Sequence, residues 1–239
     1  IMRTAPIIRH DNIDVRVQSE VTRIDREKKE VEVKEVRTGR VYRETYDKII
    51  LAPGAEPIRP PLPGINEPGI HTLRTIPDMD CIMSAIANNG TRRAVVVGAG
   101  FIGLEMAENL RERGMEVAVV EMLDQVMPPL DKEMAQIVQQ HLTLKGVQLY
   151  LGDPVAGFER KAGLLEVQLK SGAAVTAELV ILSIGVAPET KLARDAGLAI
   201  GGRKGIAVNE YMQTSDPDIY AAGDAVEVKD LVLGVDTVI

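Results

Sequence analysis

One glycine-rich stretch, residues 95–110, constrains the fold of this chain more than any other. It reads VVVGAGFIGLEMAENL, an apolar run followed by Gly98-x-Gly100-x-x-Gly103 and then a helical pattern. Between a strand and a helix, the first glycine permits a tight turn, the second lets the backbone approach a pyrophosphate, and the third lets helix and strand pack closely. The helix N-terminus adds free N–H groups and the positive end of its dipole. This context favours a dinucleotide site over a glycine turn without a ligand.

An acidic residue closes the next expected strand. Glu121 stands 18 residues after Gly103, where a carboxylate accepts hydrogen bonds from an adenosine ribose and repels a 2′-phosphate. This predicts NAD(H) rather than NADP(H), and we interpret Arg111 and Arg113 as solvated helix charges rather than 2′-phosphate ligands. Glu105, one turn into the helix, either accepts a hydrogen bond from a nicotinamide carboxamide or is a surface residue favoured by the helix dipole.

Strand and helix patterns surround the glycine loop. Alternating residues predict antiparallel strands between residues 11 and 51 and again before 179, each group leading into an apolar strand. Helices are expected near 78–87 and 131–145, the second with an apolar face made of Met134, Ile137, Val138, His141 and Leu142. Four strands are expected to share one parallel sheet: 94–97, 117–120, 147–151 and 179–184.

Two strand ends in the chain resemble each other. Leu51-x-x-Gly54-x-x-Pro57 matches Leu182-x-x-Gly185-x-x-Pro188, and an alternating multi-strand stretch precedes each. This predicts two halves built alike. The second glycine of the pair lies 87 residues after Gly98, so an equivalent first glycine loop would fall before residue 1, near position −33. The chain is therefore expected to be part of a longer protein.

A third motif, TSDPDIYAAGDA at residues 214–225, ends an expected strand in Gly223-Asp224. Open α/β sheets bind ligands at the carboxyl ends of their strands. Asp224 either holds sugar or ribitol hydroxyls there or caps the following turn.

Composition excludes several classes of function. The net charge of −7 gives no general attraction to nucleic acid or anionic membranes, and the 3% of aromatic residues disfavour stacking on single strands. A single cysteine, Cys81, excludes an internal disulfide and a cysteine-rich metal site, so no metal is predicted. We interpret Cys81 as a buried structural thiol in a reducing, cytoplasmic protein. The longest apolar run, 94–104, is too short to span a bilayer.

Four segments, in this order along the chain, carry a family resemblance: ILAPGAEP, VVVGAGFIGLEMAENL, SIGVAPET and TSDPDIYAAGDA. They resemble the pyridine nucleotide–disulfide oxidoreductases, α/β flavoproteins in which an NAD domain interrupts an FAD domain. The chain is especially similar to the branch of coenzyme A–disulfide reductases, NADH oxidases and persulfide reductases, over nearly its whole length. The resemblance implies a truncated FAD domain at 1–90, an NAD domain at 91–213 and a return segment of the FAD domain at 214–239.

The resemblance also implies roles for individual residues. Phe101 occupies a position whose ring can gate the nicotinamide pocket, with ordinary core packing as the alternative. The implied NAD contacts are the phosphate loop (Gly98, Gly100, Phe101, Ile102 and Gly103), Glu121 on the adenosine ribose, Gly185 beside the coenzyme and Glu105 near the nicotinamide. The implied FAD contacts are Val21 at the adenine, Ala52, Pro53 and Gly54 near the pyrophosphate and adenosine, and Asp224 on the ribitol or pyrophosphate side.

The implied activity is that of an NADH-dependent FAD flavoprotein reductase. Hydride would pass from nicotinamide C4 to flavin N5, and electrons would reach a disulfide or persulfide such as that of coenzyme A. The family's redox cysteine and FAD glycine loop would precede residue 1, so this chain is expected to bind NAD(H) but not to hold FAD or turn over. The full protein is expected to be a homodimer. Alternatives are an NADH oxidase, a ferredoxin-type reductase, or a non-catalytic NADH-sensing module.

Overall fold

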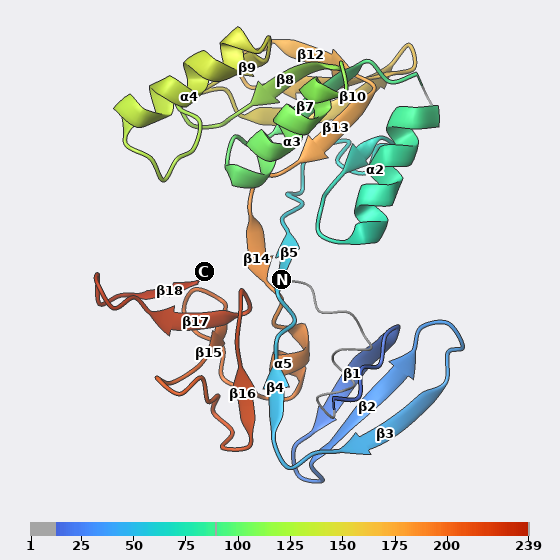
Figure 1. Cartoon of the computed structure of the whole chain (residues 1–239), viewed down its shortest axis with the longest axis vertical. Helices are drawn as coiled ribbons and strands as arrows, with labels where there is room; N and C mark the ends of the chain where they lie inside the picture. The colour runs from blue at the N-terminus through green and yellow to red at the C-terminus, as the bar shows by residue number, and fades with distance from the viewer. Residues whose placement is uncertain (1–12, 89, 239) are drawn as a thin grey trace. The chain divides into compact units, whose positions relative to one another are not determined.

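The computed structural model describes residues 13–88 and 90–238, which form two compact units. Unit 1 comprises Ile1–Ala55 and Pro188–Ile239, and unit 2 comprises Glu56–Ala187 (Figure 1). The chain passes between them in β5 (Ala55–Pro57) and β14 (Val186–Pro188), which pair as a two-stranded sheet. The boundaries expected from the sequence lie at 90/91 and 213/214, and the assignment of cofactors to domains stays a prediction.

A five-stranded parallel sheet forms the centre of unit 2, in the order β6-β13-β7-β8-β9. The four apolar strands expected to share a sheet do so, and that prediction is confirmed. The short edge strand β6 was not predicted. The strands are β6 (Ile70–His71), β7 (Arg93–Val97), β8 (Glu116–Val120), β9 (Gln148–Tyr150) and β13 (Leu179–Leu182).

Both faces of this sheet are covered, as the near-continuous apolar runs of its central strands require. Side chains alternate along β7, so Ala94 and Val96 face one core while Val95 and Val97 face another. The first core contains residues of helices α2 (Ile76–Asn88), α3 (Phe101–Glu112) and α4 (Lys132–Leu144). The second contains residues of an antiparallel meander, β10 (Val155–Lys161), β11 (Leu164–Leu169) and β12 (Ala174–Ala177).

Unit 1 repeats part of this plan. An antiparallel meander precedes strand β4 (Ile49–Leu51), as β10–β12 precede β13, and β4 pairs in parallel with β16 (Ile219–Ala221). Gly54 and Gly185 follow β4 and β13 with φ values of +74° and +112°. The prediction of two halves built alike is therefore confirmed. The other elements are β1 (Ser19–Asp25), β2 (Glu30–Glu35), β3 (Val41–Thr45), α5 (Lys191–Asp195), β15 (Ile206–Ala207), β17 (Val226–Lys229) and β18 (Asp236–Val238).

Two expectations about helix faces are wrong. Cys81 is exposed rather than buried, because α2 turns the neighbouring Ile82 into the core. In α4 the buried residues include Leu142, as predicted, but Met134 and Ile137 are more than half exposed. Both helices are apolar on more than one face, so periodicity alone does not identify the side that packs on the sheet.

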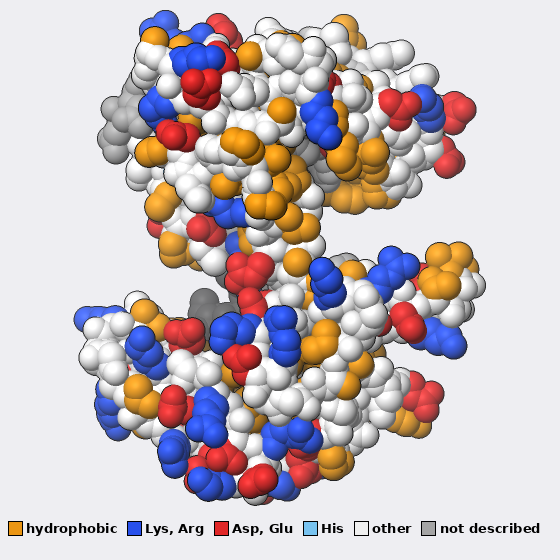
Figure 2. Space-filling model, turned by 180° about the vertical axis from the view of Figure 1, so that it is seen from behind, with side chains coloured by type: hydrophobic (Ala, Val, Ile, Leu, Met, Phe, Trp, Pro, Cys, Tyr) orange, Lys and Arg blue, Asp and Glu red, His pale blue; other side chains and the backbone are white. Residues whose placement is uncertain are grey.

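The surface differs between the two units in the view of Figure 2. Hydrophobic side chains gather on the visible face of unit 2, whereas charges of both signs dominate the visible face of unit 1. None of the helices within residues 13–88 and 90–238 combines the length and apolar character of a membrane span.

Candidate functional site

The glycine loop runs from the end of β7 into α3, as the sequence predicts. Gly98 has a φ of +102°, and an added Cβ would press against the backbone carbonyl of Ser183. A Cβ on Gly103 would collide with the carbonyl oxygen of Gly98. These two glycines therefore permit close contact between loop, helix and β13. Gly100 differs, since no atom lies within 4 Å of the position that its Cβ would occupy.

The N-terminus of α3 offers free donors at this loop. Gly100 is the N-cap, no side chain caps the helix, and its first turn carries no acidic residue. The N–H groups of a first helical turn have no partner within the helix and carry a partial positive charge. This end of α3 can therefore bind an anion such as a phosphate.

Glu121 directly follows β8 and is 8% exposed. Its Oε2 accepts a hydrogen bond from the N–H of Ala99 at 2.7 Å, and its Oε1 accepts one from Leu123 at 2.9 Å. A carboxylate has about four acceptor positions, so each oxygen can accept a further bond from a ribose hydroxyl. Sequence reasoning predicted the ribose role, which stays a prediction, and missed the bonds that tie the glycine loop to the β8 end.

A pocket of about 700 Å³ lies at the carboxyl ends of the parallel strands in unit 2. In the sheet, β8 and β9 lie on one side of β7, and β13 lies on its other side. The direction in which successive strands are added therefore reverses between β7 and β13. Ligands bind at such a switch point in open α/β sheets. Ser183 joins the two loops there, since its hydroxyl donates to the carbonyls of Val97 or Gly98 at 3.0 and 3.2 Å.

The pocket brings together most of the residues predicted to contact NAD. Gly103 is buried and does not line the pocket. Sequence reasoning missed several lining residues; four of them follow sheet strands, which is the signal that could have found them. The predicted lining residues are Gly98, Gly100, Phe101, Ile102, Glu121 and Gly185, and the missed ones include Met122, Leu123, Pro154, Ser183 and Lys170.

Residues at the start of α3 divide between this pocket and the surface. Phe101 is 64% exposed, which contradicts the core-packing alternative, while its gating role stays a prediction. Glu105 is exposed and lies outside the lining of this pocket, and its role at the nicotinamide stays a prediction. Arg111 donates to the carbonyls of Met115 and Lys145, and neither Arg111 nor Arg113 lines the pocket.

The residues predicted to contact FAD lie in unit 1. Since β4 and β16 are parallel neighbours, residues 52–54 and the Gly223-Asp224 pair leave the same edge. The N–H of Ala222 donates to the carbonyl of Leu51 at 3.0 Å. Asp224 is exposed, and Val21 is half-buried in β1. The geometry gathers these residues in one unit, and their FAD contacts stay predictions.

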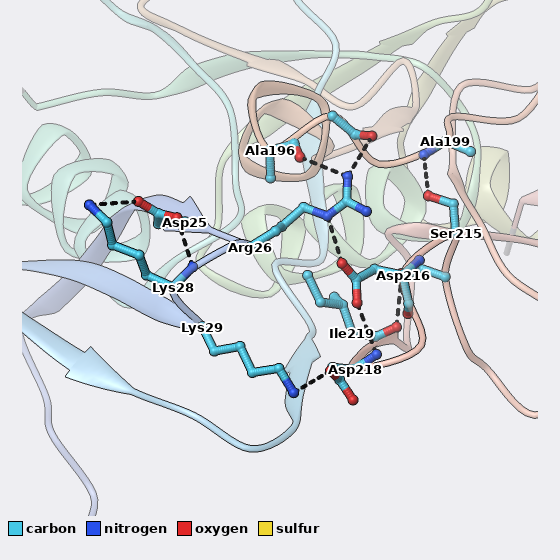
Figure 3. Close-up of polar contacts among 12 residues, drawn as sticks. Asp25, Arg26, Lys28, Lys29, Ala196, Ala199, Ser215, Asp216, Asp218 and Ile219 are labelled. Carbon is cyan, nitrogen blue, oxygen red and sulfur yellow. Dashed lines mark hydrogen bonds and ion pairs between the residues drawn. The ribbon is translucent and has the colours of Figure 1, made fainter.

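Two other acids of the 214–225 motif form ion pairs within unit 1 (Figure 3). The Nε of Arg26 donates to Asp216 at 2.7 Å, and the Nζ of Lys29 lies 2.5 Å from a carboxylate oxygen of Asp218. The Nζ of Lys48 lies 2.5 Å from the other carboxylate oxygen of Asp218. The N–H of Asp218 and the guanidinium of Arg26 hold the pKa of Asp216 below its ordinary value of 3.8. Lys29 and Lys48 lower the pKa of Asp218. These acids therefore hold the motif against the turn between β1 and β2 and the residue before β4.

Fold and pocket together define a Rossmann-type nucleotide-binding protein. The sequence model of the family described as "Pyridine nucleotide-disulphide oxidoreductase" matches residues 5–236. The chain belongs to that family.

Three known proteins illustrate the similarity. An NADH oxidase of Methanocaldococcus jannaschii is 41% identical over 95% of this chain and 50% of its own length. The crystal structure of reduced Bacillus anthracis CoADR-RHD superposes with a TM-score of 0.95 at 49% identity, over 99% of this chain and 42% of that one. An NAD-dependent persulfide reductase from A. fulgidus gives 0.92 at 39%, over 98% and 43%. The chain thus spans half or less of these proteins.

Proposed function

We propose that this chain is the nucleotide-binding part of an NADH-dependent FAD flavoprotein reductase acting on a disulfide or persulfide such as that of coenzyme A. One observation carries the proposal: Gly100 borders open space at an uncapped helix N-terminus, in a pocket of about 700 Å³. The Bacillus anthracis and A. fulgidus structures support a reductase of this class. The whole protein is proposed to be cytoplasmic and homodimeric.

The residues of unit 2 would hold NAD(H). The amides of the first turn of α3 would bind the pyrophosphate, and Glu121 would accept the hydroxyls of the adenosine ribose. Gly185 would let the coenzyme pass close to the backbone after β13. Phe101 and Ile102, both exposed toward the pocket, would exclude water from the nicotinamide end. Glu105 would help to position the nicotinamide.

The residues of unit 1 would hold part of FAD. Val21, residues 52–54 and Asp224 are the contacts proposed, and the exposed Asp224 at a strand end is free to accept hydroxyl hydrogen bonds. When both cofactors are bound, they supply hydride exchange between nicotinamide C4 and flavin N5. This chain would supply placement and electrostatics only. The redox cysteine and FAD glycine loop are proposed to belong to the rest of the protein.

The proposal is tested first by titrating this chain with NADH and following nicotinamide fluorescence. Saturable binding that ADP-ribose displaces is expected, and absence of binding would contradict the proposal. The Methanocaldococcus jannaschii relative favours NADH oxidase as the second candidate. In the full-length protein, NADH consumption without oxygen that depends on added coenzyme A disulfide or persulfide indicates the reductase, and consumption that needs only oxygen indicates the oxidase. A colourless full-length protein that binds NADH indicates a sensor.

A further inference from the structure

One cation, Lys170, lines the pocket among the residues that the structure describes, and the function proposed above does not use it. The residue is exposed, and within the described residues its ammonium group makes no hydrogen bond or ion pair. Arg111 and Arg113, at the C-terminal end of α3, donate to backbone carbonyls and do not line the pocket. The positive charge that faces this pocket therefore comes from Lys170.

Backbone hydrogen bonds place Lys170 at the Glu121 end of the pocket. The N–H of Asp153 donates to the carbonyl of Glu121 at 3.2 Å, and the N–H of Lys170 donates to the carbonyl of Pro154 at 2.9 Å. The Asp153-Pro154 dipeptide thus links the two residues. The carboxylate of Asp153 is engaged by Ser171, whose N–H and hydroxyl donate to it at 3.0 and 2.5 Å.

A positive charge at the Glu121 end of the pocket would lie near the adenosine ribose of a bound dinucleotide. If Glu121 holds the adenosine ribose, a phosphate on the 2′-hydroxyl of that ribose would project beside the same carboxylate. Glu121 repels such a phosphate, although the amides of Ala99 and Leu123 compensate part of its charge. The flexible four-carbon stem of a lysine can carry its ammonium to a phosphate oxygen.

We infer that Lys170 lets this pocket accept NADPH as a second, more weakly bound coenzyme beside NADH, by pairing with the 2′-phosphate. This inference rests on the proposed NADH site. Glu121 keeps NADH preferred, and Lys170 sets how strongly NADPH is disfavoured. A single exposed pair with a phosphate changes affinity by about tenfold.

The test compares dissociation constants for NADH and NADPH, measured by nicotinamide fluorescence. The wild-type chain should bind both, NADH more tightly. Lys170→Ala should raise the ratio of the NADPH dissociation constant to the NADH dissociation constant about tenfold. In Lys170→Arg, which keeps the positive charge, the ratio should stay close to that of the wild type. Lys145→Ala, which removes the same charge outside this pocket, should leave the ratio unchanged. The effect of Lys170→Ala should shrink in about 1 M salt, where exposed charges are screened.

The outcomes separate the two proposals. Failure of the wild-type chain to bind NADH overturns the proposed function and this inference with it. If the wild type binds NADH, an unchanged ratio in Lys170→Ala overturns the role of Lys170 alone. An equal loss of affinity for both coenzymes also overturns it, because a residue that only shapes the pocket would act in that way.

Discussion

Alanine substitutions at the two ends of the Gly98–Gly100 turn should have opposite consequences. Gly98→Ala places a side chain at a φ of +102° and drives a methyl group into the backbone of Ser183 and Ile184. Backbone atoms cannot rotate away as a side chain can. Strained φ and overpacking each cost about 1–3 kcal/mol, so unit 2 should lose about 2–6 kcal/mol. That is a large part of the 5–15 kcal/mol typical of a domain.

Gly100→Ala should spare stability and lose the ligand. Its φ of −80° suits alanine, and no atom lies within 4 Å of the new Cβ. The methyl group would instead occupy the space above the helix N-terminus where the pyrophosphate is proposed to lie. NADH affinity should fall tenfold or more, by about 1.4 kcal/mol at least. Gly202→Ala in unit 1, also without neighbours within 4 Å, is the matched control for the glycine-to-alanine change.

Urea unfolding followed by far-ultraviolet circular dichroism measures the stability effect, since the chain has no tryptophan for fluorescence. Two units can unfold separately, so the expected result is a shift of one transition. With a slope near 2 kcal/mol per M, Gly98→Ala should lower its midpoint by about 1–3 M. A midpoint equal to that of wild type, or equal destabilisation by Gly98→Ala and Gly100→Ala, would refute this reasoning.

Three further predictions concern charge, pH and the thiol. Glu121→Ala combined with Met122→Arg should raise the affinity for NADPH relative to NADH; the ratio is the readout because losing the carboxylate also leaves the Ala99 amide without a partner. A wild type that already prefers NADPH would contradict the role of Glu121. The lowered pKa values of Asp216 and Asp218 mean that the stability they add is complete above about pH 4 and is lost as pH falls through the lower folded-state values. The urea midpoint should therefore drop as the pH falls below about 4, and drop less in Asp216→Asn; an equal drop would contradict the ion pair's contribution. Cys81 is exposed, so the folded chain should react with a chromogenic thiol reagent at one thiol per chain; reaction only after denaturation would contradict the observed orientation of α2.

The parts of the fold set by local pattern could be predicted from the sequence. The apolar strands of the parallel sheet alternate with turns and helices in a spacing that leaves few arrangements. The need for glycine at positions 98 and 103 could also be predicted, because any chain with this loop must bring backbone atoms close together at these two positions. The repeated pattern of a strand, a glycine and a proline at Pro57 and Pro188 predicted two matching halves. In the structure the two copies of this pattern follow the corresponding strands β4 and β13.

What depends on tertiary contact could not be predicted. The hydrogen bond from the N–H of Ala99 to Glu121 joins a strand end to a loop about twenty residues away, and no local pattern encodes it. Free cysteines are usually buried, which favours a core position for Cys81, yet Ile82 beside it occupies the core instead. Lys170 follows β11, a strand of the antiparallel meander. The rule that ligands bind at the carboxyl ends of parallel strands therefore does not predict that Lys170 lines the pocket.

The pairing of β5 with β14 has a consequence for how this architecture can change. Unit 2 begins and ends at adjacent backbone positions, so it is a continuous insertion in the chain of unit 1. Recombination at two points in the gene, near codons 56 and 187, can therefore exchange the whole of unit 2 between relatives without changing the path of the chain in unit 1. The parallel sheet and the pocket at its carboxyl edge can thereby be exchanged as a single piece while the surrounding half keeps its own evolutionary history.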